Sequence, residues 1–184
     1  MDLSPGYSGR GPEGLPRGTV LSARQVARQL GHPLAALDDS ALDEPLVEYD
    51  YGEGWPQLDS ATLTYTQPAV CVETVLRARN PRQLDQAARS ALSGFRLDDE
   101  SDQAVPLDMD RWMQGVLAEG AALPSRSDAA GVTIDGTPFA RVVVEDGTYQ
   151  AWALETEQVQ VTVAGRHEHL ESVVLRWWQP ALIG

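Results

Sequence analysis

The stretch GVTIDGTPFARVVVEDGTYQAWALETEQVQVTVAGRHEHLESVVLRWW, residues 131–178, decides the fold of this chain. It divides into four segments rich in β-branched and aromatic residues, separated by turn-forming residues. The segments are VTID (132–135), TPFARVVVE (137–145), TYQAWALE (148–155) and VQVTV (159–163). This pattern predicts a meander of at least three antiparallel strands.

The joints and the last of these strands support that prediction. Asp135-Gly136 and Asp146-Gly147 can adopt the positive φ angles that tight hairpins need. In the last strand three valines alternate with polar residues, which predicts one buried face and one face in water. The valines are Val159, Val161 and Val163, and the polar residues are Gln158, Gln160 and Thr162.

After the last strand the spacing changes. Leu170, Val173, Val174 and Trp177 fall at positions i, i+3, i+4 and i+7, which predicts a short helix that covers the valine face and stops at Pro180. We therefore expect Trp152 and Trp177 to be largely buried.

The N-terminal end has the composition of a flexible tail. Residues 1–18 hold five glycines and three prolines, so we expect a tail over 1–19 and a single domain over 20–184. Ser22 and Gln25 form a capping-box pattern for a helix that ends at Gly31. The helix resembles the first half of a helix-turn-helix, but residues 33–48 contain no arginine to meet a phosphate.

The middle of the chain predicts two strands followed by helices. The strands are Ala61–Thr66 and Ala69–Ala78, interrupted at Pro68. Asn80 and Pro81 have the residue types of an N-cap and a first helical position, and an acidic loop is expected over 96–107. The apolar positions of the first helix are Leu84, Ala87, Ala88, Ala91, Leu92 and Phe95, and those of a second helix, from Asp108 to Gly120, are Met109, Trp112, Met113, Val116 and Leu117.

A linker over 121–130 leads into the hairpins. Together these segments predict an α+β fold: one domain with an antiparallel β-sheet flanked by three to four helices.

The net negative charge of the chain favours some classes of binding partner over others. All 14 basic residues are arginine, against 27 acidic residues, and the formal net charge is −13. Nucleic acid and anionic membranes would be repelled, whereas a basic protein would be attracted. No apolar run approaches the roughly 20 residues of a membrane span. We expect a cytoplasmic protein by default, or a secreted or cell-envelope protein if an export signal has been removed.

The acidic residues are concentrated between Asp38 and Asp59, where eight carboxylates occur without a basic residue. Within this block, EYDYGEGW interleaves aromatic and acidic side chains; the residues are Glu48, Tyr49, Asp50, Tyr51, Glu53 and Trp55. One interpretation is an edge strand and loop whose aromatic rings point inward. The other is a recognition loop for an arginine- or lysine-rich partner.

Motifs of catalysis are missing from the sequence. It contains no GK[ST] phosphate loop, no strand leading into G-x-G-x-x-G and no G-x-S-x-G elbow. Cys71 lies in an apolar strand, which favours a buried, inert thiol. His167 and His169 are candidate metal ligands, but a zinc site needs further ligands. Asp98, Glu100 and Asp102 resemble the start of a calcium loop that then lacks its glycine and final glutamate. We expect no enzyme activity and no cofactor.

Both ends of the domain resemble a known group of proteins. TVLSARQVARQLGHPL (19–34) resembles the entry helix of small actinobacterial lipoprotein and sensor-type domains, and VQVTVAGRHEHLESVVLRW (159–177) is similar to their closing strand and helix. These domains resemble the PsbP-like α/β sandwich, an antiparallel sheet with helices on both faces. The resemblance implies a binding or accessory module. This chain lacks their lipobox, export signal and cysteine pair.

Four functions remain open on the sequence. The first is a non-catalytic accessory or sensor-like module that binds a protein or small ligand. The second is an acidic immunity or inhibitor protein that neutralises a basic toxin or nuclease. The third is a structural subunit of a larger assembly, and the fourth is an enzyme without a recognisable motif.

Overall fold

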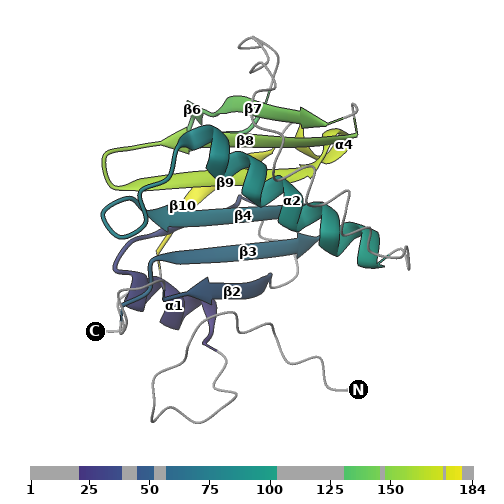
Figure 1. Ribbon diagram of the computed structural model, residues 1–184. Coiled ribbons are helices and arrows are strands. Elements are labelled where there is room, and N and C mark those ends of the chain that lie inside the picture. Colours follow the sequence, from purple (N-terminus) through teal and green to yellow (C-terminus); the bar gives the residue numbers. More distant parts are fainter. Residues whose placement is uncertain are drawn as a thin grey trace.

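The computed structural model describes residues 21–38, 45–51, 57–102, 131–145, 148–171 and 173–179. Within these ranges the chain forms a single α+β domain of two sheets and three helices (Figure 1). The α+β class and the antiparallel sheet are as predicted. The predicted tail over 1–19, helix 108–120, linker 121–130 and Asp146-Gly147 turn lie outside the described residues.

The larger sheet has six strands and is antiparallel throughout, in the order β2-β3-β4-β9-β8-β7. Its strands are β2 (Leu46–Asp50), β3 (Ser60–Thr66), β4 (Ala69–Leu76), β7 (Ala140–Glu145), β8 (Tyr149–Glu155) and β9 (Val159–Arg166). The meander β7-β8-β9 confirms the predicted run of at least three antiparallel strands, but the first predicted segment, 132–135, belongs to the other sheet. Since β9 also pairs with β4, it joins the N-terminal and C-terminal halves of the domain.

The smaller sheet is mixed, in the order β1-β10-β5-β6. Its strands are β1 (Leu34–Leu37), β5 (Thr133–Ile134), β6 (Thr137–Pro138) and β10 (Val174–Trp178). β10 runs antiparallel to β1 and parallel to β5. The turn between β5 and β6 has positive φ angles at Asp135 (44°) and Gly136 (79°), as the predicted Asp-Gly hairpin requires.

Two side-chain hydroxyl groups of the larger sheet accept hydrogen bonds from the backbone of β1. The backbone N–H of Ala35 donates to Thr74 Oγ1 (3.1 Å), and that of Leu37 donates to the hydroxyl oxygen of Tyr65 (3.2 Å). Burial raises the pKa of Tyr65, while its contact with Leu37 acts in the opposite direction. These bonds satisfy backbone donors on the side of β1 that does not pair with β10.

The predicted helix over Leu170 to Trp177 is wrong. The helix α4 (His167–Leu170) makes one turn, and the chain then continues as β10. Along this segment Val173 and Leu175 are buried, whereas Val174 and Arg176 are exposed. This alternation has the period of a strand, which the helical spacing of the same apolar residues conceals.

The prediction of one wet face on β9 is also wrong, because both faces are buried. Val159, Val161 and Val163 lie in the main core with α1 (Ala23–Leu30) and the smaller sheet. On the other face, Gln160 and Thr162 are each 1% exposed. That side is covered by α2 (Leu84–Asp102) and by the connection that leads into it.

The two longer helices agree with the sequence in part. α1 begins with the predicted capping box at Ser22 and Gln25 and ends at Gly31, whose φ is 73°. The helix α2 buries Ala87, Ala88, Leu92 and Phe95 against the sheet, as its spacing predicts.

The predicted limits of α2 are wrong at both ends. Asn80 is not its N-cap, because the helix starts at Leu84 and the Asn80 side chain donates to Asp59 Oδ2 instead (3.3 Å). Residues 96–102 are helical rather than part of an acidic loop. Asp99 holds this turn to the sheet, since it accepts hydrogen bonds from the Tyr149 hydroxyl and Arg166 Nη2 (both 2.8 Å).

Trp152 is largely buried, as predicted, and Trp177 is not. The Trp152 side chain packs in the main core, and its Nε1 donates to Gln150 Oε1 (3.2 Å). A Cβ on Gly131 would lie 2.4 Å from the Trp152 ring, so this position requires glycine. Trp177 is half-buried, with its ring 5.3 Å from that of His32.

We predict that Trp152→Ala lowers the free energy of unfolding by about 3–5 kcal/mol, because it leaves a cavity and an unpaired amide oxygen in the core. Trp177→Ala should cost clearly less, since its ring is already half in solvent. Urea denaturation of both variants measures the difference. An equal loss for the two substitutions would contradict the packing of Trp152.

Candidate functional site

The side of the larger sheet that carries α2 is the candidate site, in the part that lies beyond the helix. Directly opposed residues of paired strands share a face of a sheet. One row runs Glu48, Thr62, Glu73 and Thr162 across β2, β3, β4 and β9. The next row on the same face runs Leu46, Thr64, Cys71 and Ala164. Ala164 packs with Leu92 and Phe95 of α2. Both rows therefore lie on the α2 side.

The helix α2 packs mainly on β7, β8 and β9, and it reaches β4 with fewer contacts. Figure 1 shows it crossing the sheet diagonally, with β3 and β2 beyond it. We call the α2-side surface of β2, β3 and β4 the acidic face. Its residues include Leu46, Glu48, Asp50, Thr62, Thr64, Cys71 and Glu73.

The acidic face is partly open to solvent. Leu46 is 52% exposed, and Glu48, Thr62 and Thr64 are half-buried. Glu73 forms an ion pair with Arg82 (Oε1 to Nη2, 3.0 Å), and its second oxygen accepts from the Thr162 hydroxyl (3.3 Å). The face therefore presents carboxylates and hydroxyl groups, with Leu46 as its exposed apolar side chain.

The residues 48–51 form an edge strand and its end, as the first interpretation of the acidic segment predicts. Glu48 and Asp50 lie on the acidic face, whereas Tyr49 and Tyr51 pack toward the main core. Tyr51 is 5% exposed, and its hydroxyl donates to Gln29 Oε1 (3.4 Å). Tyr51 is thus a core residue rather than an exposed anchor. Glu53 and Trp55 lie outside the described residues.

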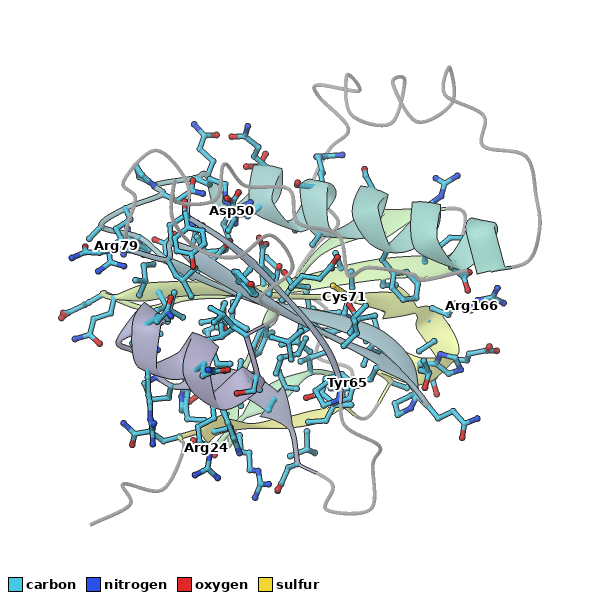
Figure 2. The ribbon with its side chains drawn as sticks, turned by 90° about the horizontal axis from the view of Figure 1, so that it is seen from below. Arg24, Asp50, Tyr65, Cys71, Arg79 and Arg166 are labelled. Atoms are coloured by element: carbon cyan, nitrogen blue, oxygen red, sulfur yellow. The ribbon has the colours of Figure 1, made fainter. Side chains whose placement is uncertain are left out.

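Asp59 lies at one end of the acidic face and is only 4% exposed. Its backbone N–H donates to the carbonyl of Asp50 (2.9 Å), and its Oδ2 accepts from Asn80. Burial raises the pKa of Asp59, and the negative charge of Asp50 raises it further. Ser60, Asn80 and Arg82 act in the opposite direction but do not cancel the effect. Figure 2 shows Asp50 and Arg79 at this same end of the molecule.

Among the described residues, three buried polar atoms near this end have no hydrogen-bond partner: Asp59 Oδ1, Arg82 Nε and Gln160 Oε1. We call these three residues the Asp59 corner. They come from three parts of the chain, but contacts link them. Gln160 Nε2 donates to the carbonyl oxygen of Arg82 (2.6 Å), and the charge of Arg82 acts on Asp59. Orphaned buried groups are costly, so this corner stores unfavourable free energy.

At the opposite end of the sheet, the charged side chains of Arg166 and Asp99 are paired with each other. Arg166, shown at the far side in Figure 2, donates from Nε (3.1 Å) and Nη2 to Asp99 Oδ2. This bond is the main cause that raises the pKa of Arg166. The guanidinium groups of Arg96 and Arg166 lie 5.5 and 5.9 Å from the ring centre of Tyr149. These contacts fix α2 to the sheet at this end.

The histidines do not form a metal site with other side chains in the described ranges. His167 contacts Gln150 through Nδ1 and Glu171 through Nε2 (3.2 Å). His169 Nε2 lies 3.7 Å from Glu168. Among the described residues no group of three or more potential ligands comes together. The sequence predicts a buried thiol at Cys71. In the structure Cys71 is only half-buried, at the margin of the α2 core.

Sequence reasoning did not single out Arg82, Glu73 or Gln160, and it counted Asp59 as one acid among eight. Gln160 was assigned to a wet face. No local residue pattern predicts that these four side chains lie close together, because strand pairing and the path of the connection into α2 bring them into one place.

Comparisons of the chain with protein-family models, with curated proteins and with solved structures give no match. In the part of the chain that the structure describes, the helices are too short or too polar to cross a membrane.

We predict that Asp59→Asn raises the melting temperature at pH 7 by roughly 2–4 °C, equivalent to about 1 kcal/mol for a chain of this size. The raised pKa of Asp59 means that folded protein binds its proton more tightly than unfolded protein. Wild-type stability from this group is therefore greatest below the ordinary value of 3.8 and is lost as the pH rises through the folded pKa. The advantage of the variant should shrink on acidification.

Asp99→Asn serves as the control, because it removes the same charge from a carboxylate that accepts bonds from Arg166 and Tyr149. It should lower the melting temperature at pH 7. Scanning calorimetry between pH 3 and 8 measures both. An Asp59→Asn variant less stable than wild type at pH 7 would contradict the cost assigned to this buried carboxylate.

Proposed function

We propose that this protein is a non-catalytic binding module that holds a basic protein partner on its acidic face. The observation that carries the proposal is the placement of Glu48, Asp50 and Glu73 on one partly open surface of a rigid sheet. A chain with a net charge of −13 attracts a basic surface over a distance, and carboxylates on a fixed scaffold then pair with its cations.

The side chains beside these acids suit close contact. Thr62 and Thr64 can donate and accept hydrogen bonds, and Leu46 supplies apolar area at the edge. The accessory or sensor-like role implied by the resemblance of both chain ends agrees with a binding surface of this kind.

An acidic immunity or inhibitor protein is the second function, favoured by the same face. A basic toxin or nuclease would be one such partner, and loss of its activity on binding would distinguish inhibition from an accessory role. A structural subunit would instead use this face within a permanent assembly, and its complex would survive high salt.

We predict that Glu48→Arg weakens retention of the partner. Wild type and variant are immobilised and exposed to native lysate, and retained proteins are eluted with rising salt. A partner held by charge should be basic and should elute well below 1 M salt, where the Debye length is about 3 Å. Its retention by the variant should fall by at least about tenfold, equivalent to about 1.4 kcal/mol.

Glu168→Arg is the matched control, because it makes the same change in net charge. Glu168 lies on α4, away from the acidic face, and its side chain is 71% exposed. The control should retain the partner as wild type does. Equal losses in both variants would show a general charge effect, and an acidic partner indifferent to Glu48→Arg would refute the proposed function.

A further inference from the structure

The Asp59 corner holds a mismatch that bears on the acidic face. Arg82 contacts Glu73 through Nη2, while its Nε has no acceptor. Asp59, which needs a cation, has an oxygen without a donor. An unpaired cationic donor and an unpaired anionic acceptor thus lie in one corner, and each is costly to bury alone.

Arg82 has the reach to serve both carboxylates. It lies two residues after Asn80, whose side chain already contacts Asp59 Oδ2. Two residues span at most about 7 Å, which is comparable to the length of an extended arginine side chain. Arg82 also comes just before α2, where the backbone carbonyl that accepts from Gln160 fixes its base. The side chain can therefore turn about a fixed point.

We propose that Arg82 is an internal counter-ion that exchanges Glu73 for Asp59 when a cationic group of the partner binds Glu73. This inference rests on the proposed function, since it assigns the regulation of the same acidic face. In the free protein Arg82 neutralises Glu73. In the complex the partner's guanidinium or ammonium group takes that place, and Arg82 moves to the unpaired oxygen of Asp59.

The exchange lowers the cost of binding. Removing Arg82 from Glu73 without a second acceptor would leave an arginine side chain that is only 20% exposed without a carboxylate partner. Asp59 provides that acceptor, and pairing satisfies Oδ1 and Nε together. The charged groups around Asp59 are Asp50 on β2 and Arg79 and Arg82 on the connection into α2. Arg79 donates to the carbonyl oxygen of Leu58, whereas Arg82 has a donor, Nε, without an acceptor among the described residues.

The exchange can be tested without a partner. Glu73→Gln removes the competing carboxylate, so Arg82 should turn to Asp59 and lower the pKa of Asp59 by about one unit. Carboxyl-carbon NMR during a pH titration of the full chain measures this value. Glu168→Gln is the control, because it removes a carboxylate on α4 whose side chain is 71% exposed and contacts His169 rather than Asp59, Arg82 or Gln160. It should leave the pKa of Asp59 within about 0.3 unit of wild type, a small fraction of the shift that a close cation causes.

A double substitution separates movement of Arg82 from the simple loss of a negative charge. In an Arg82→Gln background, Glu73→Gln should no longer lower the pKa of Asp59. The same drop with and without Arg82, or no drop in Glu73→Gln alone, would overturn the exchange.

This result is independent of retention by the acidic face. A partner lost on Glu48→Arg together with an unchanged pKa of Asp59 would support the proposed function and refute the exchange. A lowered pKa of Asp59 in Glu73→Gln without any retained partner would support the exchange and refute the proposed function.

Discussion

Strand β9 has to bury both of its faces, and the rest of the structure depends on this constraint. Its valines need the main core, which α1 and the smaller sheet close. Its other face needs a cover that tolerates Gln160 and Thr162. Gln160 meets the carbonyl of Arg82 and Glu155, while Thr162 meets Glu73. The polar side chains of a central strand thereby determine the path of the connection into α2.

That path explains why the acidic face exists. The connection reaches back to Asp59 through Asn80 before α2 begins at Leu84. From there the helix packs toward β7, β8 and β9, with its far end held by Asp99, Tyr149 and Arg166. In Figure 1 the helix starts over the β7 and β8 side of the sheet and descends toward β3, and β2 lies below it at the edge of the sheet. The acids and threonines of β2 and β3 can then meet a partner, and Arg82 is the internal cation that pairs with Glu73.

The sequence predicts the elements whose signals are local. The Ser22–Gln25 capping box, the Asp135-Gly136 turn and the spacing from Leu84 to Phe95 each depend on neighbouring residues, and each is confirmed. The failures concern signals with two meanings or long-range causes. Apolar residues at 173–177 fit both helical and strand spacing, and pairing with β1 decides for a strand. Polar residues on β9 indicate water unless another part of the chain covers them.

The candidate site was predictable in its charge but not in its arrangement. The acidic block identified Glu48 and Asp50, yet the side of the strand that each residue occupies follows from register with β3. Tyr51, which follows the end of β2, lies in the main core, whereas the recognition hypothesis predicts it on the surface. The Asp59 corner depends on residues more than 70 positions apart, such as Arg82 and Gln160, which no local pattern connects.

The most direct test of this account is an amide NMR spectrum of the ¹⁵N-labelled protein, recorded with and without its retained partner. The account predicts that shifts concentrate at Glu48, Thr62, Thr64 and Glu73 on the acidic face. Resonances of Val174 and Arg176, which are exposed on the smaller sheet, should stay in place. Shifts centred on β10 with an unchanged acidic face would contradict the central claim.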